Sequence, residues 1–144
     1  STQGYSSAAS DVYKRQVYTM RKGERKVMEV FWDADQPMSH SDLCAKMNGT
    51  MSKNTLYLHL NRLLDHDLVE VESLVRRGRT YGRTFRPAIS RTEYYAMQVA
   101  EMAEKDHAAL EDVIAYLLTS KAVTNATLDA VEARIAQKRK ELNG

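Results

Sequence analysis

Apolar residues recur every three or four positions between residues 52 and 68, and this spacing predicts a helix. The side expected to face the core carries Leu56, Leu60, Leu63 and Leu64, with His59 at its margin. The opposite side is neither a run of Lys/Glu pairs nor a second apolar stripe; it carries Asn54, Thr55, Tyr57, Leu58, Asn61, Arg62 and Asp65. Amide, hydroxyl and guanidinium groups bind base edges and phosphates, and an exposed leucine can contact a thymine methyl. The alternative is an ordinary solvated amphipathic helix, and the neighbouring elements decide between the two.

Two shorter helices are predicted before this one. The first covers residues 21–32, where Val27, Val30 and Phe31 share a face and Trp32 is a core anchor at the helix end. Ser39 with Asp42 three residues later is a capping-box pattern for a helix that runs to about Met47. Residues 48–50 then break the chain, and Ser52 is a good N-cap for the helix that follows. Together these elements predict a helix-turn-helix.

A β-hairpin is predicted after the third helix. Apolar and polar residues alternate over residues 68–74, residues 75–82 form an arginine-rich turn with two glycines, and residues 83–87 return with Phe85 directed inward. Three helices followed by such a hairpin form a winged helix, in which the third helix enters the major groove and the wing lies along a phosphate backbone. The fold class expected is therefore mainly α with a small β-hairpin.

The segments ERKVMEVFWD, MSKNTLYLHLNRLLDHDLVEVE and RRGRTYGRTFRPAISRTEY resemble, in order and spacing, the penicillinase-repressor family of bacterial regulators (the BlaI/MecI/CopY group). The matching features are a first helix that ends in Trp32, a Ser52-x-x-Thr55 start to the third helix, Arg62-Leu63 near its end, and Arg79-x-Tyr81 in the wing. The resemblance covers roughly residues 20–140. It implies a dimeric repressor that binds a pseudo-palindromic operator near a promoter.

A helical segment follows the hairpin. From Thr92 apolar residues recur at helical spacing, residues 120–125 break the pattern, and a last helix covers about residues 126–142. Two helices alone have no third layer against which to bury their stripes, so a second copy of the chain is the expected partner. The alternative is that they fold back onto the winged helix of the same chain. The residues expected at the dimer contact are Val99, Ala103, Leu110, Ile114, Leu117, Leu128, Val131 and Ile135.

The net charge is only +2, but the charge is unevenly distributed. Residues 73–92 contain six arginines and no acidic residue, and guanidinium forks suit phosphate oxygens. We assign base reading to Asn54, Thr55, Tyr57, Leu58 and Asn61, and phosphate contact to Ser52, Lys53, Arg62, Arg77 and Arg79.

Composition and motifs define the expected domains and exclude several classes of function. The 144 residues divide into an arm at 1–16 that is disordered or not native, a DNA-binding domain at 17–90 and a dimerisation domain at 91–144. No apolar run is long enough to span a bilayer and no start resembles a signal peptide, so we expect a cytoplasmic protein. The four histidines lack a zinc-site spacing, and there is neither a phosphate-binding glycine loop nor a nucleophile elbow. We therefore expect no enzyme activity, no cofactor and no metal.

Two departures from the family concern the inducing signal. Copper-responsive members carry paired Cys-x-Cys motifs, whereas Cys44 is alone here and is expected to lie half-buried on its helix. Penicillinase-type members are inactivated by a partner protease at an Asn-Phe bond, and no Asn-Phe occurs in this chain. Cleavage by such a protease would then fall at an unassigned position within residues 95–118. The sequence names neither the operator, nor the regulated genes, nor the inducer.

Two other functions remain open. The winged helix could be a protein-interaction module that uses Tyr57 and Leu58 as an apolar contact. It could also belong to a small-molecule-responsive regulator of the PadR-like or multidrug type, with a ligand held among Tyr94, Tyr95, Met97 and Met102.

Overall fold

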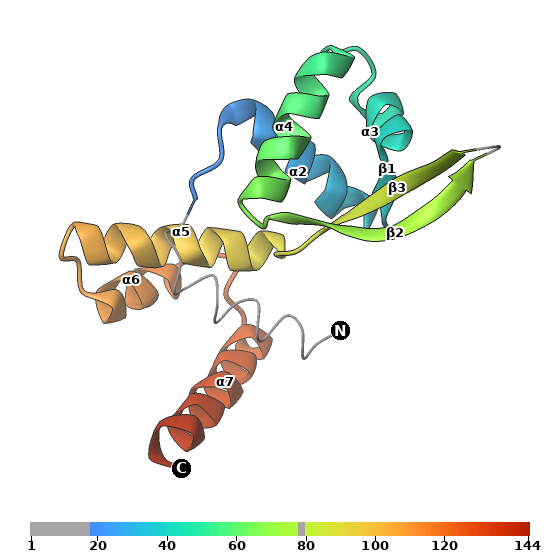
Figure 1. Cartoon of the computed structure of the whole chain (residues 1–144). Helices are drawn as coiled ribbons and strands as arrows, with labels where there is room; N and C mark the ends of the chain where they lie inside the picture. The colour runs from blue at the N-terminus through green and yellow to red at the C-terminus, as the bar shows by residue number, and fades with distance from the viewer. Residues whose placement is uncertain (1–17, 78–79) are drawn as a thin grey trace. The chain divides into compact units, whose positions relative to one another are not determined.

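The computed structural model describes residues 18–77 and 80–144, with residues 75–77 and 80–81 described as backbone only. The elements in chain order are α2 (Lys22–Ala34), β1 (Met38–Ser39), α3 (His40–Met47), α4 (Lys53–Asp65), β2 (Val69–Arg77), β3 (Thr80–Pro87), α5 (Arg91–Lys105), α6 (Leu110–Leu117) and α7 (Asn125–Asn143) (Figure 1). The expected arm at residues 1–16 lies outside the described residues. The chain divides into two compact units, one ending at Val99 and the other covering Ala100–Gly144.

Helix capping fixes where α3 and α4 begin. The Ser39 hydroxyl accepts a hydrogen bond from the Asp42 amide at 3.1 Å, while the Asp42 carboxylate accepts one from the Ser39 amide at 3.0 Å. The Ser52 hydroxyl likewise accepts from the Thr55 amide at 3.1 Å. Each bond satisfies an amide that has no partner within the first turn of a helix. Both predicted caps are confirmed.

Helices α2, α3 and α4 pack around one hydrophobic core in the first unit. The inner face of α4 buries Leu56, Leu60 and Leu63 almost completely, whereas Leu64 is only partly buried at the edge. Phe31 is buried on α2, and the half-buried Trp32 donates its indole N–H to the Ile89 carbonyl at 3.0 Å. The other members of this core are Val27, Met28, Met38, Leu43, Met47, Leu68, Val69, Phe85, Ile89, Tyr94 and Met97.

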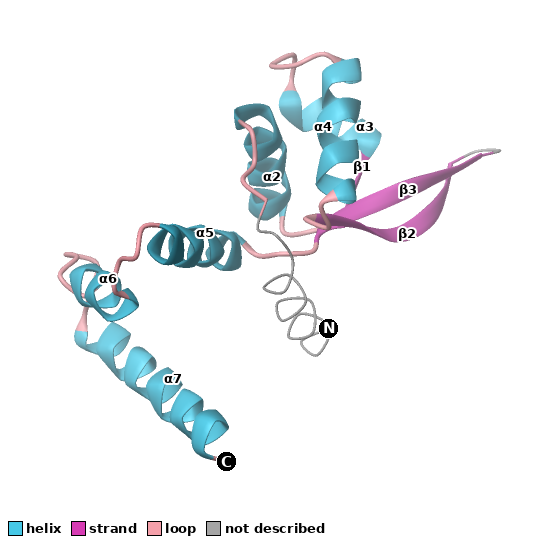
Figure 2. Cartoon of the chain, turned by 60° about the vertical axis from the view of Figure 1, so that its left-hand side comes forward, coloured by secondary structure: helices cyan, strands magenta, loops and turns pink. Residues whose placement is uncertain are grey.

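The three strands form an antiparallel sheet in the order β1-β3-β2. Met38 pairs with Phe85, Val69 pairs with Pro87, and a bulge between Val71 and Ser73 shifts the register of the hairpin. The β2–β3 hairpin extends away from the three helices as a wing (Figure 2). Leu74 on β2 is 65% exposed although it continues the apolar pattern.

Two predicted segments differ from the structure. The hairpin strands run to Arg77 and from Thr80, so the connection is much shorter than the predicted turn at 75–82. The single helix predicted from Thr92 is also wrong, because α5 ends at Lys105 and α6 begins at Leu110. Between them His107 takes a left-handed conformation with φ 55°, and the Ala108 amide bonds back to the Ala103 carbonyl at 2.8 Å, which ends the helix without glycine or proline.

In the second unit, α6 and α7 contain no buried residue. The last helix lies close to its predicted range and is capped by Thr124, whose hydroxyl accepts from the Thr127 amide at 3.3 Å. Among the residues described, no helix is both long and apolar enough to cross a membrane.

Candidate nucleic-acid interface

The outer face of α4 carries the residues assigned to base reading. Asn54, Thr55, Tyr57, Leu58 and Asn61 are all exposed, and their spacing places them on one side of the helix. Tyr57 is 47% exposed and Leu58 50%, so both side chains are accessible on a helix whose inner face is packed into the core. The helix therefore offers amides, a hydroxyl, an aromatic ring and an aliphatic group on a single accessible surface.

The residues assigned to phosphate contact are placed less uniformly. Ser52 and Lys53 are exposed at the start of α4, and Arg62 is partly buried near its end. The Ser52 hydroxyl donates to the Thr55 hydroxyl at 2.8 Å, so its proton is already engaged within the cap. Arg77 is described only as a backbone position of β2, and Arg79 lies outside the described residues.

Tyr57 rests on a histidine that the sequence did not single out. The rings of Tyr57 and His40 stack with centroids 3.5 Å apart and an interplanar angle of 15°. His40 Nδ1 also lies 3.6 Å from the Cys44 sulfur, and Cys44 is half-buried as predicted. Burial, followed by the positive charge of Lys53, lowers the pKa of His40, so the ring under Tyr57 is neutral near pH 7. Tyr57 is thus held by α3, a contact between two helices that no single-helix pattern reveals.

A groove of about 170 Å³ separates this stacked pair from the wing. Its lining residues come from β1, the start of α3, α4 and β3: Ser39, His40, Ser41, Tyr57, Gly82, Arg83 and Phe85. Arg83 is exposed, its guanidinium lies 5.3 Å from the centre of the Phe85 ring, and no described carboxylate forms an ion pair with it. Arg83 is therefore a phosphate-contact candidate that our assignment omitted, although the arginine-rich stretch contained it.

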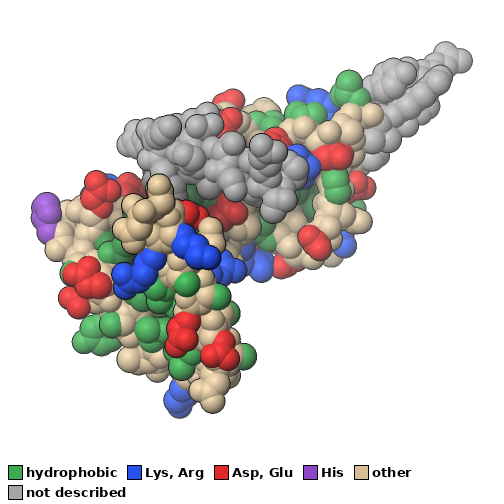
Figure 3. Space-filling model, turned by 90° about the horizontal axis from the view of Figure 1, so that it is seen from below, with side chains coloured by type: hydrophobic (Ala, Val, Ile, Leu, Met, Phe, Trp, Pro, Cys, Tyr) green, Lys and Arg blue, Asp and Glu red, His purple; other side chains and the backbone are tan. Residues whose placement is uncertain are grey.

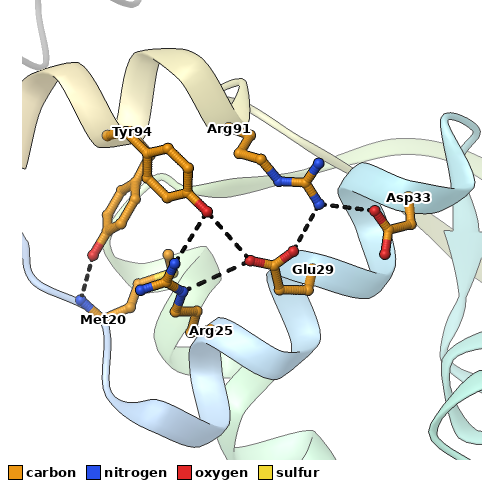
Figure 4. A network of polar contacts seen from close by, with 7 residues as sticks. Met20, Arg25, Glu29, Asp33, Arg91 and Tyr94 are labelled. Atoms are coloured by element: carbon orange, nitrogen blue, oxygen red, sulfur yellow. Dashed lines mark hydrogen bonds and ion pairs between the residues drawn. The ribbon is translucent and has the colours of Figure 1, made fainter. Parts of the chain in front are cut away.

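Two other arginines of that stretch serve the fold. Arg86 pairs with Glu70 across the hairpin at 2.6 Å, and Arg91 pairs with Glu29 at 2.7 Å and Asp33 at 2.8 Å. Figure 4 shows Arg91 reaching from α5 to the carboxylates of Glu29 and Asp33 on α2. The sequence could not separate these roles, because the acidic partners lie far away in the chain.

The apolar residues expected at a dimer contact are largely uncovered in the second unit. Leu110 is 51% exposed, Ile114 46% and Leu117 63%, and on α7 Leu128 and Ile135 are exposed as well. Val131 is partly buried, as is Val99 in the first unit, and Ala103 is buried. In the space-filling view, hydrophobic side chains reach the surface between acidic and basic ones (Figure 3).

Three helices around one core, a polar outer face on the third and a β-hairpin wing define the winged helix-turn-helix class. The sequence profile of the penicillinase repressor family matches residues 21–137, and the chain belongs to this family. Its members are DNA-binding transcriptional repressors rather than enzymes. The predicted family and fold class are thereby confirmed.

Solved structures of repressors are similar to this chain. The Bacillus licheniformis BlaI monomer in complex with the blaP half-operator is 20% identical, with 55% of this chain and 92% of that chain covered and a TM-score of 0.41. Staphylococcus aureus MarR in complex with salicylate and kanamycin is 16% identical, with 85% and 73% covered and a TM-score of 0.39. The adhesin competence repressor AdcR of Streptococcus pyogenes is 13% identical, with 99% and 95% covered and a TM-score of 0.38. Comparison with curated proteins finds no match.

Proposed function

We propose that this chain represses transcription as a homodimer that binds a pseudo-palindromic operator. The observation that carries the proposal is the exposed outer face of α4, where Asn54, Thr55, Tyr57, Leu58 and Asn61 stand over a fully packed inner face. One such helix from each protomer would read a half-site in the major groove. The side chains that would contact phosphates are those of Lys53, Arg62, Arg77, Arg79 and Arg83.

We assign residues 17–90 to DNA binding and residues 91–144 to dimerisation. The exposed apolar stripe of Leu110, Ile114 and Leu117 supports the second assignment, since no residue of α6 or α7 is fully buried. An apolar surface of this kind is costly to leave in water and is typical of an interface. The pseudo-palindrome follows from the two-fold symmetry of such a dimer.

The first experiment selects duplexes from a randomised pool and measures binding of the selected sequence and of random DNA at two salt concentrations. We expect a specific, salt-steep complex with two inverted half-sites, because phosphate contacts release counterions and base contacts give the preference. Equal affinity for selected and random DNA would contradict sequence-specific binding and favour the alternative in which Tyr57 and Leu58 contact another protein.

Dimerisation is tested by sedimentation of Ile114→Asp. A carboxylate at the centre of an apolar contact should weaken the dimer at least tenfold, or about 1.4 kcal/mol. Leu142→Asp is the matched control, because Leu142 is also an exposed apolar residue but lies outside the proposed contact. Equal dissociation constants for both variants and the unaltered chain would contradict the assignment of α6.

We further propose that a partner protease, if one inactivates the repressor, cuts within residues 106–109. These residues join α5 to α6 and are exposed, which are the conditions under which a protease can engage an extended backbone. Limited digestion with a broad-specificity protease, followed by mass spectrometry, should find the first cut of the 95–118 region there. A first cut inside α5 or α6 would contradict this placement.

The four residues of the ligand-responsive alternative differ in burial. Tyr94 and Met97 are buried in the core of the first unit, and the Tyr94 hydroxyl accepts a hydrogen bond from the Met20 amide at 2.9 Å. Tyr95 and Met102, the other two residues of that alternative, are exposed.

A further inference from the structure

The first unit contains a cavity of about 460 Å³ that the proposed DNA contacts do not use. It lies at the end of α2, beside the base of the wing and the start of α5. Its apolar wall includes Trp32, Pro37, Pro87 and Ile89. The volume falls within the range of roughly 300 to 1,000 Å³ that small-molecule sites occupy.

The charges around this cavity are unbalanced. Its two arginines are already paired, Arg86 with Glu70 and Arg91 with two carboxylates of α2. Asp35 and Glu72 also line the cavity, and neither forms an ion pair with a described basic residue. Glu72 accepts a hydrogen bond from the Thr84 hydroxyl at 3.1 Å, which leaves its charge unneutralised. The uncompensated charge facing the cavity is therefore negative.

We propose that this cavity binds a small organic cation with an apolar body. An ammonium group would lie against Asp35 and Glu72, where it meets carboxylates without displacing an existing ion pair. The apolar part would lie along Trp32 and the two prolines. An anionic ligand fits less well, because it would have to draw Arg86 or Arg91 away from its carboxylate. This site is independent of the DNA-binding proposal.

Intrinsic fluorescence can measure binding at this site, because Trp32 lines the cavity and is the single tryptophan of the chain. The probe is 2-phenylethylammonium, compared with 2-phenylethanol and 3-phenylpropionate, which share the phenyl ring but are neutral and anionic. Excitation at the red edge of tryptophan absorption avoids the phenyl ring. We expect a saturable change in Trp32 emission with the ammonium, at least about tenfold weaker binding of the other two, and weakening by salt. No saturable change, or equal binding of all three, would overturn the proposal.

Two nearly isosteric variants locate the binding site. Asp35 has a left-handed backbone with φ 51°, which asparagine also tolerates, so Asp35→Asn removes the charge without new strain. Glu72→Gln keeps an oxygen that can accept from Thr84. Each change should weaken the ammonium about threefold to tenfold, and both together should abolish saturation. Asp129→Asn on α7 is the matched control and should bind as the unaltered chain does. Undiminished binding by the double variant would place the cation elsewhere and refute the assignment.

Discussion

Gly23 on α2 lies close to the His59 side chain of α4, and replacing Gly23 tests that contact. A Cβ atom at residue 23 would lie 2.3 Å from Nε2 and 2.8 Å from Cε1 of His59 on α4. Van der Waals contact begins at roughly 3.5 Å, so the imidazole ring would have to move. His59 Nδ1 is buried without a hydrogen-bond partner among the described atoms, so its ring is enclosed by protein on that side too.

The sign of the change in the free energy of unfolding on Gly23→Ala distinguishes the steric effect of this contact from the effect of helix propensity. Glycine to alanine inside a helix ordinarily stabilises a protein by about 0.5–1 kcal/mol. Overpacking a close helix contact costs about 1–3 kcal/mol, so the net change lies between about zero and 2.5 kcal/mol, and Gly23→Ala should lower the free energy of unfolding by about 1 kcal/mol. Denaturant unfolding followed by circular dichroism gives this value directly.

A double-mutant cycle tests whether the loss of stability on Gly23→Ala comes from the His59 imidazole ring. In the His59→Ala background the space opposite residue 23 is open, so the same glycine substitution should become neutral or stabilising. If Gly23→Ala stabilises the unaltered chain, or if the loss persists without the imidazole, the close approach of α2 and α4 is not what limits residue 23.

Three further predictions concern single side chains. Asn61→Ala should remove roughly 1–3 kcal/mol of discrimination at one base position of the selected operator. Equal losses of affinity for operator and random DNA would show that Asn61 does not read a base. Arg83→Ala, like Arg79→Ala, should weaken binding to operator and random DNA alike and make the slope of log affinity against log salt concentration shallower by about one unit. An unchanged slope would show that the wing does not contact phosphates. Burial, with the hydrogen bond to Glu24 next, raises the pKa of Tyr18 from 10.0 to about 12, so its contribution to stability is complete below about pH 10 and is lost as pH rises through about 12. The absorbance titration of Tyr18→Phe should lack one tyrosine that ionises near pH 12 in the native chain. Identical high-pH limbs of the two titration curves would contradict the shift.

The parts of the fold that local rules determine were predictable from the sequence. Ser39, Asp42 and Ser52 act within one helical turn of themselves, and the leucine spacing of residues 56–63 is a property of one helix. The exposed face of α4 followed from the same spacing, because whatever is not on the buried side must face outward.

Features that depend on distant residues were not predictable. The stack of His40 under Tyr57 requires knowing how α3 crosses α4, and the pairing of Arg91 with Glu29 requires knowing that α5 returns to α2. The end of α5 at Lys105 carries no glycine or proline, so the apolar spacing continued past the break without a local signal. Whether the assigned base and phosphate contacts are made stays a prediction for the DNA measurements above.

Residues with left-handed backbone at the ends of α3 and α5 are positions where a substitution can raise the thermal stability. Asn48 ends α3 with φ 45°, and His107 follows α5 with φ 55°. A side chain at such an angle costs roughly 1 kcal/mol, which glycine avoids, although glycine also gains freedom in the unfolded chain. The balance should favour His107→Gly more than Asn48→Gly, because asparagine tolerates this backbone better than histidine does. A more heat-resistant repressor is therefore within reach of one substitution that leaves the α4 surface untouched.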